Sequence, residues 1–301
     1  MKRKRSAFFI LFVWVLMMAL GTAAAVILWL LLTDRTSVES MKWLQAMQVL
    51  FLFIAPALAM TWLYQENPAR WLQLDTSPRG RVWVFAVLLM IVMLPGINLL
   101  SHWNQQLELP SFLSGLEAWM KQREEDSAKL LEQFMQTKSL GGLLINLGLM
   151  ALLPAVGEEL TFRGVLLHII TNPSTPFSEP DRRKRMHLAI WVTAFVFSFV
   201  HFQFYGFLPR MLMGALFGYV LWWTGSLWVA MAMHFTNNAT VTLLYFICLR
   251  TGRDMEALDA FGSGDTLWAG ILSIVISIIG IYFFRRSLTM SNASSRTSAG
   301  N

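Results

Sequence analysis

The chain of 301 residues is 55% hydrophobic and only 14% charged, and its mean hydropathy is +0.51. This composition excludes an ordinary water-soluble domain and predicts a polytopic membrane protein. The formal net charge of +6 comes largely from basic residues beside apolar runs, so we expect no nucleic-acid partner.

Eight apolar runs are each long enough to cross a bilayer as a helix, which takes roughly 20 residues. In chain order they cover residues 8–32, 43–64, 82–100, 140–170, 188–204, 207–223, 227–249 and 267–284. We therefore predict an all-α fold, a membrane bundle of about eight transmembrane helices. One membrane domain is expected over residues 1–286, with a disordered tail at 287–301. The first run is too long for a signal peptide, so we expect it to be retained.

Lysine and arginine residues gather at the ends of alternate runs. They are Lys2, Arg3, Lys4, Arg5, Arg70, Arg79, Arg81, Arg182, Arg183, Lys184, Arg185, Arg285 and Arg286. Basic residues in short loops mark the cytoplasmic side of a membrane protein. Both termini are therefore predicted to be cytoplasmic, and the loop at 101–139 to lie on the opposite side. The short loops and the lack of a targeting signal favour a bacterial inner membrane.

The longest polar insertion, residues 101–139, carries apolar residues at helical spacing. They are Phe112, Leu113, Leu116, Trp119 and Met120, followed by Leu130, Leu131, Phe134 and Met135. This pattern predicts one or two amphipathic helices at the outer membrane interface. A plain surface helix is the simpler interpretation, and a lid or substrate platform is the alternative.

The run at 140–170 contains the segment GEELTFRG, with Glu158, Glu159 and Arg163 at membrane depth. A charged side chain there costs at least about 2.5–3.5 kcal/mol. Glu159 and Arg163 are four positions apart, so they share a helix face and can form an ion pair. Glu158 lies about 100° round the helix and remains to face a cavity. A structural ion pair explains Glu159 and Arg163, but it does not explain Glu158.

Two further runs bring polar residues to a comparable depth. His201 lies in FSFVHF, and His234 and Asn238 lie in HFTNN, where their spacing of four puts them on one helix face. A lone histidine in an apolar segment is usually a packed core residue. Several such groups in three runs of one protein instead indicate a common site, since each is unfavourable in hydrocarbon.

Arg210, directly after Pro209 at the start of a run, is expected to be an interfacial residue that extends toward the headgroups. A contact with a substrate carboxylate is the alternative. His102, His168 and His187 are expected to be surface or interfacial residues.

The residue types suit two kinds of peptide hydrolysis. In the first, a buried glutamate activates water, a histidine assists, and an amide and an imidazole stabilise the oxyanion. In the second, Glu158, His201 and His234 hold a divalent metal such as zinc, with an open position for water. The sequence does not distinguish the two.

Three motifs carry a resemblance to a known family. GEELTFRG resembles the EExxxR motif, residues 197–201 the FxxxH motif, and HFTNN the HxxxN motif of the CPBP intramembrane proteases, the family of CAAX proteases and bacteriocin-processing or abortive-infection proteins. The order and spacing of the motifs agree over roughly residues 142–249.

The resemblance implies an intramembrane endopeptidase that acts on a peptide, prenylated or of the leader type. By this likeness Glu158 activates water with the help of His201. Glu159 and Arg163 support it, while His234 and Asn238 stabilise the oxyanion or complete a metal site.

Two other functions use similar residues. A transporter or proton relay also places Glu, His and Arg in the membrane, although the sequence lacks paired broken spans in two similar halves. A non-catalytic immunity scaffold is the third candidate. For an enzyme, the run at 188–204 presents a difficulty, because His201 is farther from the basic end of its helix than His234 is from its own. Either that helix begins later than the apolar run or is tilted, or one motif does not converge with the others; we expect the predicted boundary to be wrong.

Overall fold

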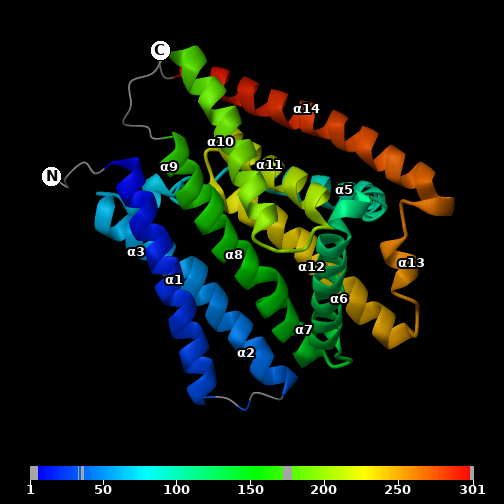
Figure 1. The fold of residues 1–301 in the computed structure, drawn as a ribbon. Coiled ribbons are helices and arrows are strands. Elements are labelled where there is room, and N and C mark those ends of the chain that lie inside the picture. Colours follow the sequence, from blue (N-terminus) through cyan, green and yellow to red (C-terminus); the bar gives the residue numbers. More distant parts are fainter. Residues whose placement is uncertain (1–5, 33, 35–36, 172–177, 299–301) are drawn as a thin grey trace.

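The computed structural model describes residues 6–32, 34, 37–171 and 178–298 (Figure 1). Within these ranges the chain is helical and has no strand, which confirms the predicted all-α fold. The basic cluster from Lys2 to Arg5 lies outside the described residues.

The elements follow one another as a series of long helices with short turns. They are α1 (Ala7–Leu32), α2 (Val38–Gln48), the π-helical η1 (Val49–Ile54), α3 (Ala55–Tyr64), α4 (Pro68–Trp71), α5 (Gly80–Gln105), the 3₁₀ turn η2 (Ser111–Leu113), α6 (Ser114–Met135), α7 (Leu140–Asn146), the π-helical η3 (Leu147–Leu152), α8 (Leu153–Glu159), the π-helical η4 (Leu160–Leu166), α9 (Leu167–Thr171), α10 (Glu179–Phe199), α11 (Phe207–Thr224), α12 (Leu227–Thr251), α13 (Glu256–Asp259), the 3₁₀ turn η5 (Gly264–Thr266) and α14 (Leu267–Ser298).

Five helical segments are long and apolar enough to cross a membrane, which identifies an integral membrane protein. They are Ala7–Leu32, Val38–Tyr64, Gly80–Gln105, Leu140–Thr171 and Ala257–Leu288. The three other predicted spans form α10, α11 and α12, but these do not reach the same apolarity. The polar first turns of α10 lower the mean hydropathy of that helix. In α12 the polar residues of HFTNN have the same effect. The count of eight spans is thus confirmed for five.

Helix α10 differs from the apolar run predicted at 188–204, and that boundary is corrected at both ends. The helix begins at Glu179, where the Ser178 side chain accepts a hydrogen bond from Asp181 N and Pro180 occupies the first turn. Such caps start helices irrespective of hydropathy. It ends at Phe199, so His201 lies in the turn that follows.

The two ends of the bundle are held together by different segments. At one end, which we call the core end, the segment between α4 and α5 meets the turn between α11 and α12. There Leu227 N donates to Gln73 O at 3.0 Å, and Ser226 Oγ donates to Thr76 O at 2.7 Å. At the other end, the roof end, α6 lies beside the start of α7 (Figure 1).

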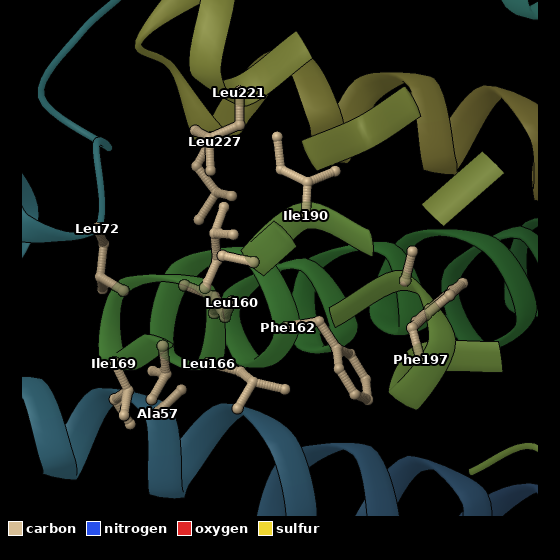
Figure 2. Close-up of a cluster of buried hydrophobic side chains, with 14 of the residues drawn as sticks. Ala57, Leu72, Leu160, Phe162, Leu166, Ile169, Ile190, Phe197, Leu221 and Leu227 are labelled. Atoms are coloured by element: carbon tan, nitrogen blue, oxygen red, sulfur yellow. The ribbon is translucent and has the colours of Figure 1, made fainter. Parts of the chain in front are cut away.

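A packed hydrophobic cluster, part of which is drawn in Figure 2, extends from Phe197 beside the site to Leu72 and Leu227 at the core end. It joins side chains from α3, η4, α9, α10, α11 and α12, including Ala57, Leu160, Phe162, Leu166, Ile169, Ile190, Phe197, Leu221 and Leu227. Leu72, Leu221 and Leu227 are each no more than 2% exposed. The core end is therefore closed by tightly packed side chains.

The π-helical segment η1 packs closely against the helix that carries GEELTFRG. A Cβ added at Gly157 would lie 2.7 Å from Val49 Cγ1, so a larger residue does not fit without movement. Thr161 Oγ1 on η4 donates to Phe53 O on η1 at 3.2 Å. Because π-helical turns often occur at functional sites, this contact places irregular backbone directly beside the charged residues.

Helix α14 packs along α5, where Pro95 interrupts the backbone hydrogen bonds. Ser273 Oγ accepts from Gly96 N at 3.0 Å and donates to Val92 O, so this hydroxyl is inserted into the α5 ladder. Helix α14 continues to Ser298. The domain limits predicted from the sequence, with a tail from residue 287, stay a prediction.

Candidate active site

The floor of the site is a buried ion pair. Arg163 Nη1 donates to Glu159 Oε1 at 2.7 Å, and both side chains are 0% exposed. Arg163 Nη2 also donates to Gly214 O at 2.9 Å, and the guanidinium lies 4.4 Å from the centre of the Phe197 ring. The ion pair expected from the spacing of four is thus present, and α11 supplies a further partner for the arginine.

Gly214 leaves space for that arginine. A Cβ at this position would lie 2.9 Å from Arg163 Nη2 and 3.0 Å from Phe197 Cδ1. The close approach of α11 to α10 and η4 therefore depends on a residue without a side chain.

His234 on α12 is oriented by the same carboxylate. Its Nδ1 lies 2.9 Å from Glu159 Oε1, and its ring stacks on Phe217 with 5.4 Å between the ring centres. The buried carboxylate accepts hydrogen bonds, so Nδ1 carries the hydrogen and Nε2 has a lone pair in the neutral ring. That Nε2 lies 3.8 Å from Glu158 Oε2.

His201 presents the same nitrogen from the opposite wall. Its Nδ1 lies 2.6 Å from Phe197 O, a carbonyl that can only accept, so Nδ1 is again the protonated nitrogen. Its Nε2 lies 3.8 Å from Glu158 Oε2. In the neutral form of each ring, both imidazoles therefore place a nitrogen lone pair near one carboxylate oxygen.

The turn that carries His201, residues 200–206, is fixed by a buried asparagine. Asn104 at the end of α5 donates from Nδ2 to Phe204 O at 2.9 Å and accepts from Leu208 N at 3.2 Å. Nothing in the sequence pattern marked Asn104, because the turn and the asparagine are 100 positions apart.

Glu158 stands between the imidazoles and is 12% exposed. The separations of 3.8 Å exceed the length of a hydrogen bond, so the groups surround a small space. A water molecule in this space could donate to the carboxylate and to an imidazole.

The space belongs to a cavity of about 340 Å³. It is lined by Gln45, Leu131, Met135, Met150, Pro154, Glu158, Phe197, His201, Gln203, Arg210, Met213, Phe217, His234, Asn237, Asn238, Val241 and Thr242. Four of the sequence-predicted site residues, Glu158, His201, His234 and Asn238, thus line one cavity. Glu159 and Arg163 do not line it; Glu159 contacts His234, and Arg163 in turn holds Glu159.

Asn238 lies one turn beyond His234 and is held by its neighbour. Asn237 Nδ2 donates to Asn238 Oδ1 at 3.0 Å. This contact uses the carbonyl oxygen of the Asn238 amide and none of its NH₂ hydrogens. The amide therefore keeps its capacity to donate to a bound group.

Arg210 lies in the cavity wall, unlike the interfacial position expected from the sequence. Its Nη2 donates to Gln203 Oε1 at 2.6 Å and its Nη1 donates to Gln203 O at 3.2 Å. Both residues line the cavity, and sequence reasoning had no signal for Gln203.

Helix α6, which we call the roof, is largely exposed but also contributes to the cavity wall; whether it acts as a lid or substrate platform stays a prediction. Leu131 and Met135 line the cavity from α6. Glu124 accepts from Tyr205 N at 3.3 Å, and the Trp119 ring lies 5.6 Å from the Phe204 ring, centre to centre. Burial raises the pKa of the Glu124 carboxyl, while the Tyr205 hydrogen bond and Arg210 act in the opposite direction.

The donor types of Glu158, His201 and His234 suit zinc, and a carboxylate on the second nitrogen of His234 is a usual feature of zinc-bound histidine. Over the part of the chain that the structure describes, however, no group of three or more His, Cys, Asp or Glu side chains is spaced to hold a metal ion.

A family model described as type II CAAX prenyl endopeptidase, Rce1-like, matches residues 140–240. The match contains all three motifs and every residue of the ion pair and of the glutamate and histidine cluster. No curated protein and no solved structure matches the chain.

Proposed function

Because residues 140–240 belong to the Rce1-like type II CAAX prenyl endopeptidase family, we propose that this chain is an intramembrane endopeptidase whose active site is the cavity around Glu158. Membership implies a protease with a protein substrate. The observation that carries the assignment to this cavity is the convergence of two imidazole nitrogens, each 3.8 Å away, on one carboxylate oxygen of Glu158.

In the proposed reaction, a water held between Glu158 and His201 attacks the carbonyl carbon of the peptide bond. Glu158 takes a proton from the water as its oxygen bonds to carbon. The same proton, or one passed to His201 Nε2, then goes to the leaving amine as the C–N bond breaks. The bond from His201 Nδ1 to Phe197 O keeps Nε2 available for this transfer.

The negative oxygen that forms on the substrate needs donors. Asn238 can donate from its NH₂ group in any protonation state. With its Nδ1 hydrogen directed at Glu159 Oε1, His234 can donate from Nε2 only as an imidazolium. Asn238 can therefore donate a hydrogen bond to the oxyanion at all times, whereas His234 can do so only when its ring is doubly protonated.

We favour a reaction without metal. Asn238 is a poor zinc ligand and a good amide donor, and the glutamate and histidine side chains are not spaced as a metal site among the described residues. Elemental analysis of chelator-treated protein tests this choice. We expect full activity with no bound metal, whereas stoichiometric zinc that follows activity would contradict it.

A mass-spectrometric search for new peptide termini tests the function itself. Membranes that contain the wild-type protein are compared with membranes that contain Glu158→Ala, and the exposed Glu66→Ala is the matched control. We expect a set of termini that is present with the wild type and the control and absent with Glu158→Ala. Identical termini in all three would favour a transporter or a non-catalytic scaffold.

The substrate is proposed to be a membrane-associated peptide, with prenylated and leader-type peptides as the two classes. Helix α6 contributes Leu131 and Met135 to the cavity wall, and exposed apolar side chains occur on α6 and on the preceding turn η2, including Trp119 at 45% and Phe112 at 81%. Such a surface suits a substrate that is itself held at the membrane.

A further inference from the structure

The turn of residues 200–206 carries two of the cavity residues. His201 and Gln203 both line the cavity, and both lie in this turn, outside any helix. The backbone N–H of His201 donates to Ser198 O, at a long 3.4 Å. The position of the His201 imidazole beside Glu158 therefore depends on what fixes the turn.

The backbone of this turn is strained at Phe202. Its φ is 52°, in the left-handed region that residues other than glycine and asparagine rarely adopt. The Phe202 side chain is 44% exposed, so burial of its ring does not explain the conformation. A strained backbone persists where the surrounding structure fixes it. Contacts from elsewhere in the chain must therefore hold the turn.

Asn104, near the end of α5, supplies such a contact. Its Nδ2 donates to Phe204 O at 2.9 Å, and its Oδ1 accepts from Leu208 N at 3.2 Å. The first partner lies in the turn and the second in the first turn of α11, so one amide joins the two. Asn104 is 5% exposed, and both hydrogen bonds are therefore shielded from water.

The other side chains that contact the turn are less independent of it or less firmly held. Arg210 contacts Gln203 from only seven positions further along the chain, so it moves with the end of the turn. Glu124 accepts from Tyr205 N at 3.3 Å, but it belongs to the largely exposed α6. Helix α5, by contrast, packs along α11, α12 and α14. Asn104 is therefore the contact that joins the turn to the packed helices.

We infer that Asn104 is a positioning residue, which holds the turn of residues 200–206 so that the His201 imidazole stays beside Glu158. Asn104 does not line the cavity and acts through the backbone of the turn. It also lies outside residues 140–240, so the family match assigns it no role. The effect on cleavage rests on the proposed function, whereas the placement of the imidazole does not.

Asn98, on the same helix, is a matched control. Its Nδ2 donates to Leu258 O at 3.2 Å and to Phe261 O at 3.1 Å, so it also joins a connecting segment to α5. That segment follows α12 and does not line the cavity. Replacing either asparagine removes hydrogen bonds to the backbone of a connecting segment, but only the loss of Asn104 should affect His201.

NMR spectroscopy can observe the His201 ring directly. The full chain is labelled with ¹³C at Cε1 of its five histidines and purified in detergent. The signals of His201 and His234 are assigned from their loss in His201→Gln and His234→Gln. Spectra at one pH are then compared for the wild type, Asn104→Ala and Asn98→Ala, beside thermal melts. We expect Asn104→Ala to shift or split the His201 signal without moving that of His234, and Asn98→Ala to move neither.

A second variant, Asn104→Asp, keeps the shape of the side chain. Its carboxylate can still accept from Leu208 N at the start of α11, where a helix N-terminus favours negative charge, so we expect the protein to fold. The carboxylate has no hydrogen to donate to Phe204 O. The His201 signal should therefore move as it does in Asn104→Ala, and Asn98→Asp is the control for the added charge.

An unchanged His201 signal in folded Asn104→Asp protein would overturn the inference. An equal displacement in the Asn98 variants would overturn it as well, and so would an equal displacement of the His234 signal. Either of these results would show that the whole bundle had loosened. None of these outcomes depends on catalysis.

Cleavage of a peptide found among the Glu158-dependent termini gives the second readout. A misplaced catalytic group should lower kcat by about 10²-fold, while KM should stay near the wild-type value because Asn104 does not line the cavity. Wild-type kcat in a variant with a displaced His201 signal would overturn the effect on catalysis. A complete lack of Glu158-dependent cleavage would contradict the protease, and the NMR spectra alone would then decide the placement of the ring.

Discussion

The same long helices run through the core end and the roof end, but the charged side chains facing the two ends differ in burial and in pairing. At the core end, Glu159 and Arg163 are fully buried, share a short ion pair, and have further partners in His234 and Gly214. One residue earlier, Glu158 faces a cavity and meets its neighbours only at 3.8 Å. The difference indicates that a charge in this protein is either paired in a packed environment or given access to water.

The largest effect in this comparison should follow from Glu158→Gln. The change keeps the shape of the side chain and removes the proton acceptor, so turnover should fall by about 10²–10⁴-fold. Because Glu158 is in the cavity and outside the packed core, the melting temperature in detergent should stay near that of the wild type. Rates on a peptide identified from the membrane termini, measured beside thermal melts, check both statements.

Glu159→Gln should have the opposite profile. It leaves the fully buried Arg163 without its charged partner, which should lower the free energy of unfolding by about 3–5 kcal/mol. Glu159 Oε2 has no hydrogen-bond partner among the described residues, so an amide NH₂ there would add buried unsatisfied donors.

Replacing Arg163 by Met as well should restore part of that stability, since no buried charge then remains. Thermal and denaturant unfolding of the single and double variants measure the effect. Equal losses of stability and of activity in Glu158→Gln and Glu159→Gln would contradict the division between the two glutamates.

Asn238→Ala should slow the chemical step while leaving the fold intact. Loss of one oxyanion donor typically lowers kcat by about 10²–10³-fold. Asn237→Ala is the matched control, because Asn237 lines the same cavity and contacts Asn238 but has no assigned role toward the oxyanion. If Asn237→Ala lowered kcat as much as Asn238→Ala, the role of Asn238 as the oxyanion donor would be contradicted.

The smallest effect concerns the attachment of the roof. The pKa of Glu124 is raised in the folded protein by burial, from an ordinary value of 4.5. As pH rises from 4.5 toward the raised value, the folded protein keeps a proton that the unfolded chain has lost, so the free energy of unfolding decreases across that window.

Thermal melts over that pH range should show this shallow decrease in the wild type and lose it in Glu124→Gln. Glu125→Gln, an exposed change on the same helix, should keep it. The same slope in both variants would show that another group titrates.

The sequence predicted the parts of the molecule that follow from local spacing. The ion pair of Glu159 and Arg163 follows from a separation of four, and the meeting of Glu158, His201 and His234 follows from the high free energy of isolated polar groups in hydrocarbon. The all-helical class follows from apolar length. The catalytic roles assigned to these residues stay predictions.

Features that depend on tertiary contacts could not be predicted. Helix α10 starts at a cap outside the apolar run, so hydropathy did not mark its beginning. Arg210 meets Gln203 because the turn at 200–206 folds back, with Phe202 at a φ of 52°. The position of α6 over the cavity is set by contacts of Trp119 and Glu124 with that turn, and amphipathic spacing contains no information about such partners.

One oxygen atom, Glu159 Oε1, receives hydrogen bonds from both Arg163 and His234. Through Arg163 that atom is linked to the backbone of α11 at Gly214, and through His234 to α12. The carboxylate that orients the His234 ring is therefore also the one that ties η4 to α11 through Arg163. A substitution that moves α11 at Gly214 should displace the imidazole as well, although Gly214 does not line the cavity.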